Sequence, residues 1–153
     1  MSIIHSINIS KGGVPKTSVN GAEVTFDGFI GDKQNDLKHH GGKLKAVCLY
    51  SLDLIEKLNL EGHLIFPGST GENLTLSGFD WNVMRIGLKL MIGDTIIKLT
   101  GPAKPCKTIS SSFNSGMYLR IDEKKFPGWS RWYASVIKEG RIRLGDAVLL
   151  IEG

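Results

Sequence analysis

Cysteines, long apolar runs and an excess of charge of one sign are all scarce in this sequence of 153 residues. Two cysteines, Cys48 and Cys106, are too few for the disulfide framework of a small secreted domain, so we expect free thiols. The longest apolar stretch, residues 83–99, is interrupted by charged side chains and cannot cross a bilayer. Residues 1–6 show no signal-peptide pattern. These absences predict a cytoplasmic protein with no membrane partner.

The charge balance and composition are those of a globular protein. Lys and Arg number 19 against 15 Asp and Glu, which gives a net charge of +4. This mild excess permits an anionic ligand but is too small to indicate nucleic acid. Nineteen glycines favour turns over long helices, and the length predicts one domain over residues 1–153.

Most segments with a clear pattern predict strands. Residues 3–9 nearly alternate between apolar and polar, which indicates a half-buried strand, and residues 46–50 form a short apolar run typical of a buried strand. Residues 84–86 predict another strand. Residues 129–139 fit either a helical face or a strand, and we favour a strand from Tyr133 onward.

Turn and cap signals complete the expected fold. Asn20-Gly21 supplies the positive φ values of a type I′ turn and predicts a hairpin, and residues 141–151 predict a second hairpin. A helix is expected to begin after Ser51, a good N-cap residue, and to end near Gly62. We therefore expect a mainly β domain, a closed or nearly closed β-barrel with a few short helices.

Cys106 is the more reactive of the two cysteines on sequence grounds. It lies between Lys104 and Lys107, directly after Pro105, which can open a helix. Nearby cations and a helix N-terminus both lower the pKa of a thiol, and the thiolate is the form that attacks, accepts sulfur or binds a metal. The alternative is a small apolar residue without chemistry. Cys48 has apolar neighbours on both sides and is expected in the core.

Two glycine-spaced polar loops are further candidates for a site. Residues 31–42 carry two histidines, and His40 or His39 could act as donor, ligand or proton carrier, although no zinc pattern is present. Residues 68–75 lack the ending of a phosphate-binding P-loop. In both loops the polar side chains could instead cap their own backbone as solvated turns.

A cluster of basic and aromatic residues occupies the last third of the chain. Arginine recognises phosphate or carboxylate well, and stacking on aromatic rings could form a groove for single-stranded nucleic acid. Aromatic residues near a hairpin more often belong to the core, so we do not expect nucleic acid as a partner. The cluster consists of Arg120, Trp129, Arg131, Trp132, Tyr133, Arg141 and Arg143.

An ordered set of motifs resembles the MOSC domain, which is named for the C-terminal part of molybdenum cofactor sulfurase. The motifs cover residues 20–150 in the family's order. They are Gly31-Asp32-Lys33-Gln34-Asn35-Asp36 with His40-Gly41-Gly42 and Ala46-Val47, then Gly68-x-x-Gly71-Glu72-Asn73-Leu74-Thr75, Ile92-Gly93-Asp94, Pro105-Cys106, Gly128-Trp129 with Trp132-Tyr133-Ala134-x-Val136, and Gly145-Asp146.

The resemblance implies a barrel of the pyruvate-kinase type and a role with the molybdenum cofactor, molybdopterin, or with sulfur for a metal–sulfur cluster. Cys106 matches the family's signature cysteine, which is described as a persulfide carrier or as a thiolate ligand of molybdenum. We expect five further residues to line the same pocket as cofactor-binding residues: Asp32, His40, Glu72, Asn73 and Arg131.

Stand-alone bacterial relatives in this family include reductases of N-hydroxylated compounds. The leading hypothesis is therefore an oxidoreductase that acts on a small-molecule substrate through a cysteine-ligated molybdenum and takes electrons from a donor protein. The alternative is a non-catalytic sulfur carrier with a persulfide on Cys106, supplied by a separate cysteine desulfurase. No pyridoxal phosphate (PLP) is expected in this chain. A third possibility is a nucleic-acid or protein-binding barrel without thiol chemistry.

Overall fold

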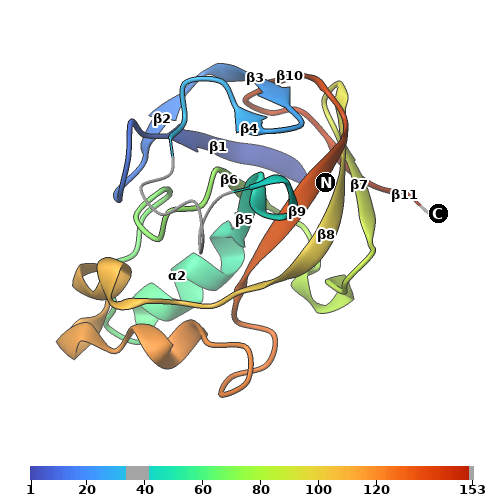
Figure 1. The fold of residues 1–153 in the computed structure, drawn as a ribbon. Helices are drawn as coiled ribbons and strands as arrows, with labels where there is room; N and C mark the ends of the chain where they lie inside the picture. The colour runs from blue at the N-terminus through green and yellow to red at the C-terminus, as the bar shows by residue number, and fades with distance from the viewer. Residues whose placement is uncertain (34–41, 152–153) are drawn as a thin grey trace.

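A computed structural model describes residues 1–33 and 42–151 and shows a mainly β protein with few helical turns (Figure 1). The strands are β1 (Ile3–Ile9), β2 (Thr17–Val19), β3 (Gly21–Thr25), β4 (Gly28–Phe29), β5 (Val47–Ser51), β6 (Leu74–Ser77), β7 (Lys89–Ile92), β8 (Thr95–Ala103), β9 (Arg131–Lys138), β10 (Gly140–Arg143) and β11 (Val148–Ile151). The helical segments are η1 (Lys43–Lys45), α2 (Leu52–Leu60), η2 (Trp81–Val83), η3 (Lys107–Ser112), η4 (Asn114–Gly116) and η5 (Tyr118–Ile121), where η marks a 3-10 helix.

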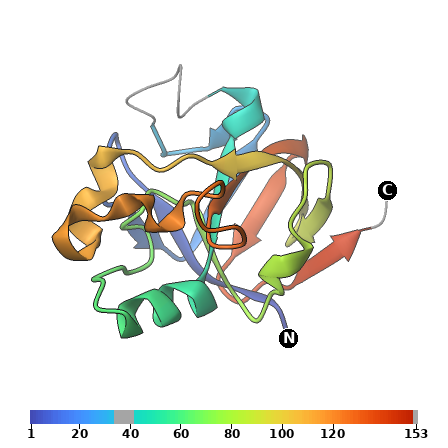
Figure 2. The same ribbon diagram turned by 90° about the horizontal axis from the view of Figure 1, so that it is seen from below.

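The described strands form two sheets. The larger has the order β11-β7-β8-β9-β5-β6-β1-β2, and the smaller has the order β10-β3-β4. Neighbouring strands are antiparallel except for β5 and β6, which run parallel and are joined through α2. Residues 107–121 lie beside the C-terminal end of α2 (Figure 2), where Arg120 binds Glu61 and the backbone N–H of Asn114 donates to His63.

The expected closed barrel is not confirmed, because the pairing of the larger sheet ends at β11 and β2. The sheet is nevertheless strongly curved. An isolated bridge joins Ile3 to Ala147, and the backbone N–H of Ile4 donates to the carbonyl of Asp146. The segment leading into β11 thus reaches the start of β1 over a few residues, without a continuous ladder between the two strands.

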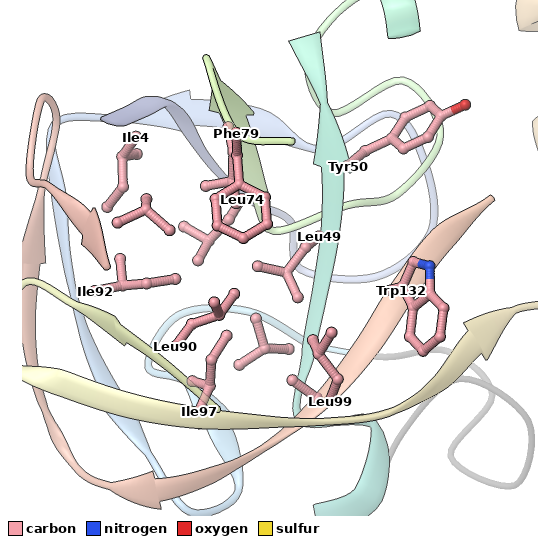
Figure 3. Packing of buried hydrophobic residues seen from close by; sticks show 14 of the residues in the cluster. Ile4, Leu49, Tyr50, Leu74, Phe79, Leu90, Ile92, Ile97, Leu99 and Trp132 are labelled. Carbon is pink, nitrogen blue, oxygen red and sulfur yellow. The ribbon is translucent and has the colours of Figure 1, made fainter. Parts of the chain in front are cut away.

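Strand β9 separates the hydrophobic core from the opposite face of the sheet. Trp132, Ala134 and Val136 alternate along it and are buried in the core, because successive side chains of a strand point to opposite faces. Arg131 and Tyr133 therefore point to the other face. Figure 3 shows the core itself, with apolar side chains converging from β5, β7 and β8.

A β-bulge in β8 changes which of its residues share a face. Leu99 lies opposite Ala134, and Gly101 lies opposite Tyr133, so Thr100 is an extra residue with no partner of its own. The alternation restarts after the bulge. Ala103 consequently lies opposite Arg131, on the face away from the core.

Several sequence-based expectations are confirmed. Ser51 caps α2 by accepting a hydrogen bond from the backbone N–H of Leu54 at 3.1 Å, and Leu54, Ile55 and Leu58 form the buried face of that helix. Residues 133 onward are a strand, within β9. Among the described residues, no helix has both the length and the apolar character needed to span a membrane.

Three expectations about local structure are wrong. The Asn20-Gly21 hairpin does not form, because β2 pairs with β1 whereas β3 pairs with β10 and β4, so the chain changes sheets there. The hairpin predicted over residues 141–151 is absent for the same reason, since β11 pairs with β7. Residues 84–86 are not a strand but follow the turn η2, which Asp80 caps.

Candidate functional site

A pocket of about 670 Å³ opens on the face of β9 away from the core. Its walls come from β5 and β9, from the end of β8 and the start of η3, and from two loops that precede β2 and β6. The lining residues are Gly13, Val14, Lys16, Lys45, Cys48, Thr70, Gly71, Pro102, Lys104, Pro105, Cys106, Lys107, Thr108, Ile109, Arg131 and Tyr133.

The pocket is strongly cationic. Five of its described lining residues are basic and none is acidic: Lys16, Lys45, Lys104, Lys107 and Arg131. A concave surface lined by charges of one sign concentrates ligands of the opposite sign. Five of the 19 Lys and Arg residues of the sequence thus line this one pocket.

Cys106 lies in this pocket with its thiol partly exposed. It occupies the N-cap position of η3, and its Sγ is 2.8 Å from the Oγ1 of Thr108. The expected helix after Pro105 is thus a short 3-10 helix. Lys104 and Lys107, which lie near the thiol in the sequence, line the same pocket.

Cys48 is buried in the pocket wall, and its thiol is expected to be unreactive. It lies opposite Tyr133 across the β5–β9 pair and packs with Ala103 apart from the main core. Burial disfavours the thiolate and raises the pKa of Cys48 to about 11. Two thiols therefore share one pocket, and Cys106 is the accessible one.

Arg131 is buried in the wall, with 5% of its surface exposed. Its Nη1 donates to the carbonyl of Thr70, and its Nη2 donates to the carbonyl of Lys104 at 3.4 Å. Its Nε has no hydrogen-bond partner, and among residues 1–33 and 42–151 no carboxylate forms an ion pair with it. The guanidinium is thus held by two carbonyl dipoles rather than by a counter-ion.

Asp32 and Asn73 do not line the pocket themselves but bind residues that do. Asp32 forms a buried ion pair with Lys16 at 2.7 Å and accepts a hydrogen bond from the side-chain amide of Asn73 at 2.9 Å. The side-chain oxygen of Asn73 accepts from the backbone N–H of Cys48 at 3.0 Å. These two residues hold Lys16 and Cys48, which do line the pocket.

Glu72 is completely buried and also lies behind the wall. Its carboxylate accepts hydrogen bonds from the backbone N–H of Gly68 at 3.1 Å and from the hydroxyls of Thr70 at 2.8 Å and Thr75 at 2.9 Å. Burial is the largest influence on Glu72 and raises the pKa of its carboxyl. Glu72 therefore fixes Thr70, whose carbonyl in turn holds Arg131.

Two of the residues predicted for the site, Cys106 and Arg131, lie together in the pocket lining. Asp32, Glu72 and Asn73 are not in the lining but hold residues that are. His40 lies outside the described residues. Sequence reasoning missed Lys16 and Tyr133 as lining residues. The alternation along β9 could have indicated Tyr133, which is two residues from Arg131, whereas no local signal marks Lys16.

The donor set suits a metal that arrives with its own ligand better than one held by side chains alone. Among the described residues, no group of three or more His, Cys, Asp or Glu side chains could hold a metal ion. The pocket offers the thiol of Cys106 as a soft donor together with cations for an anionic group. These residues fit a cofactor that brings both a metal and a negative charge.

Comparison with known proteins gives one family and several relatives. A family model described as the MOSC domain matches residues 36–149. Protein YflK of Bacillus subtilis is 30% identical over 144 residues, which cover 91% of this chain and 63% of YflK. Protein YiiM of Escherichia coli is 25% identical over 134 residues, which cover 84% of this chain and 59% of YiiM.

A protein named reductase from Gibberella moniliformis is 28% identical over 130 residues, which cover 82% of this chain and 23% of the reductase. This chain thus spans less than two thirds of the length of each of these curated relatives. The crystal structure of YiiM from Geobacillus stearothermophilus superposes with a TM-score of 0.75 at 25% identity, covering 99% of this chain and 76% of that one. The matching structures therefore share this fold.

Proposed function

Because the chain belongs to the MOSC domain family, we propose that it binds a molybdopterin-type cofactor in the cationic pocket and reduces N-hydroxylated compounds. One observation carries the proposal. A partly exposed thiol and five basic side chains line one pocket, with no acidic side chain among the described lining residues. When bound, the cofactor supplies a molybdenum centre that can accept an oxygen atom and change its oxidation state.

Cys106 would hold the metal. A thiolate is a soft ligand and suits a metal that already has sulfur ligands. The hydroxyl of Thr108, 2.8 Å from Sγ, can donate a hydrogen bond that orients the thiolate.

The basic side chains would hold the anionic part of the cofactor. Lys16 is fixed by its ion pair with Asp32, and Arg131 is fixed by the carbonyls of Thr70 and Lys104. Both are buried, so neither has to give up much conformational freedom when a ligand binds. This part of the pocket is organised before the ligand arrives.

Tyr133 would act on the substrate rather than on the metal. Burial raises the pKa of this phenol well above its usual range, so its hydroxyl remains protonated at neutral pH. It lies on the same face of β9 as Arg131 and lines the pocket. A protonated phenol there can donate a hydrogen bond to the oxygen of an N-hydroxylated substrate and help it to leave.

The reductase-named relative supports a redox reaction over simple cofactor storage. Reduction of an N–O bond consumes two electrons and two protons, so we propose an electron-donor protein as a partner. A second candidate function is sulfur carriage, which the partial exposure of the Cys106 thiol favours. In that case a cysteine desulfurase would transfer a sulfur atom to Cys106 to form a persulfide, and Cys106 would then donate that terminal sulfur to an acceptor.

Metal analysis tests the proposal. The chain is expressed in a host that makes the molybdenum cofactor, beside Cys106→Ala and beside Ser111→Ala, an exposed position of η3 outside the pocket. We expect near-stoichiometric molybdenum in the wild type and in Ser111→Ala, and its loss in Cys106→Ala. Molybdenum in none of the three samples would overturn the proposal, and a mass gain of about 32 Da on Cys106 after incubation with a desulfurase would support sulfur carriage.

A further inference from the structure

The guanidinium of Arg131 is a buried cation whose hydrogen-bonding capacity is only partly used. A guanidinium has five N–H donors, and within residues 1–33 and 42–151 Arg131 makes two hydrogen bonds, both to uncharged carbonyl oxygens. Its Nε has no partner within the part of the chain that the structure describes. Buried charges are normally paired because their desolvation is costly. Because no carboxylate of the described residues forms an ion pair with Arg131, the buried charge points to a ligand.

Arg131 is also held rigidly in place. It opens strand β9, opposite Ala103 of β8, which fixes its backbone. The Thr70 carbonyl that accepts from Nη1 is in turn fixed by the bond from the Thr70 hydroxyl to Glu72. Because Glu72 is completely buried, this arrangement is shielded from water. A rigid donor loses little entropy on binding a ligand.

The surroundings of Arg131 select for an anion of high charge. Lys104, whose carbonyl accepts from Nη2, lines the pocket with Lys16 and Lys107. Lys16 is neutralised by Asp32, whereas none of the described carboxylates forms an ion pair with Lys104 or Lys107. A ligand with a single carboxylate group would need only one of these cations to balance its charge. A phosphate monoester, which carries up to two negative charges and three terminal oxygens, matches a guanidinium fork with lysines around it.

We propose that Arg131 and Lys104 form a binding subsite for a phosphate monoester, with Glu72 as a positioning residue that acts through Thr70. The phosphate could belong to the cofactor or to a phosphorylated substrate such as a nucleotide. Only the identity of that larger molecule rests on the proposed function. The subsite itself is a property of this chain, and inorganic phosphate is its simplest probe.

The first test observes Arg131 directly. Inorganic phosphate is titrated into the full chain, prepared without molybdenum cofactor, while the arginine Nε–H resonances are followed by NMR. Arg131→Lys identifies the Arg131 resonance by its disappearance. We expect that resonance to shift and saturate while that of Arg141, which is exposed and paired with Glu23, does not. A resonance of Arg131 that moves no more than that of Arg141 would overturn the subsite.

Variants test the same subsite by affinity. Removing a hydrogen bond to a charged group should weaken phosphate binding by ~10-fold or more in Arg131→Gln, measured by calorimetry. Arg141→Gln, outside the pocket, is the matched control and should bind as the wild type does. If Arg131→Gln loses its circular dichroism spectrum, Lys104→Gln decides, because Lys104 is exposed and its replacement leaves the fold intact. Unchanged affinity in Lys104→Gln would then refute the subsite.

A third titration, on the molybdenum-loaded protein, identifies the source of the phosphate. Loss of phosphate binding on loading would assign the subsite to the phosphate of the cofactor, and retained binding would assign it to a phosphorylated substrate. The two proposals also fail separately. Molybdenum retention without phosphate binding refutes the subsite alone, and phosphate binding without molybdenum refutes the proposed function alone.

Discussion

Asn73 and Cys48 are joined by two hydrogen bonds that run in opposite directions. The backbone N–H of Cys48 donates to the side-chain oxygen of Asn73 at 3.0 Å, and the backbone N–H of Asn73 donates to the carbonyl of Cys48 at 2.8 Å. The side-chain amide of Asn73 continues to Asp32, which holds Lys16. One buried side chain thus connects three of the segments that build the pocket.

Replacing Asn73 by Ala should therefore destabilise the whole protein. The change leaves the N–H of Cys48 buried without a partner and removes one donor from Asp32. We expect a loss of about 2–4 kcal/mol in the free energy of unfolding, measured with urea. Asn82→Ala, at an exposed position, is the matched control and should change stability by less than about 0.5 kcal/mol. Equal effects of the two substitutions would contradict this account of Asn73.

Two glycines with similar backbone angles should respond very differently to alanine. Gly68 has φ +87° and Gly87 has φ +92°, so both carry the strain of a positive φ. A Cβ at Gly68 would also overlap the carbonyl oxygen of Lys16, whereas a Cβ at Gly87 meets nothing within 4 Å. We expect thermal unfolding to show a loss of about 1 kcal/mol for Gly87→Ala and at least about 3 kcal/mol for Gly68→Ala. Similar losses would mean that the loop can move aside.

The two cysteines should differ in reactivity in the native protein. Cys106 is partly exposed, whereas Cys48 is buried and its pKa is raised to about 11. Since only the thiolate is alkylated, we expect iodoacetamide to label Cys48 at least ~100-fold more slowly than Cys106. Peptide mapping by mass spectrometry measures both rates, and denaturant should make both thiols reactive. Fast native labelling of Cys48 would show that the pocket wall opens.

Glu72 should make the protein less stable as the pH rises. Burial raises the pKa of Glu72 in the folded state above its ordinary value of 4.5, so the folded protein binds its proton more tightly than the unfolded chain does. Its contribution is complete below that ordinary value and is lost as the pH rises towards the folded-state pKa.

Glu72→Gln removes this dependence and provides the measurement. Urea unfolding of both proteins is compared from about pH 4 to about pH 8, and the free energy of the wild type should fall relative to that of the variant as the pH rises. A difference between the two proteins that stays constant with pH, or that grows in favour of the wild type, would show that Glu72 ionises in the folded protein at least as readily as in the unfolded chain.

Local patterns predicted the parts of the fold that local interactions determine. The cap at Ser51 and the apolar run of β5 were correct because each depends on residues close by in the chain. The Asn20-Gly21 hairpin was wrong because the partners of β2 and β3 are far away, in β1 and β10. A turn signal gives the direction of the chain but not the sheet that each strand joins.

The same distinction applies to the site. Cys106 and Arg131 carried recognisable chemistry, and both line the pocket. Asp32 and Glu72 carried equally suggestive chemistry in glycine-rich loops, yet their partners are a distant lysine and nearby hydroxyls. A carboxylate that binds a ligand and one that holds a loop have the same local sequence. The two roles are distinguished only by the folded structure, which places Lys16 beside Asp32 and the backbone N–H of Gly68 beside Glu72.

Because of the bulge at Thr100, the number of residues in β8, as well as their identity, determines which side chains line the pocket. Before the bulge, Leu99 faces the core, and after it Ala103 faces the pocket opposite Arg131. If the same residues paired with β9 in simple alternation, without the bulge, Ala103 would share the face of Leu99 and point to the core. Single substitutions along β8 do not change which of its positions face the core and which face the pocket. A residue inserted into this part of β8 must therefore be taken up by the bulge, since otherwise the end of the strand turns over and different side chains line the pocket.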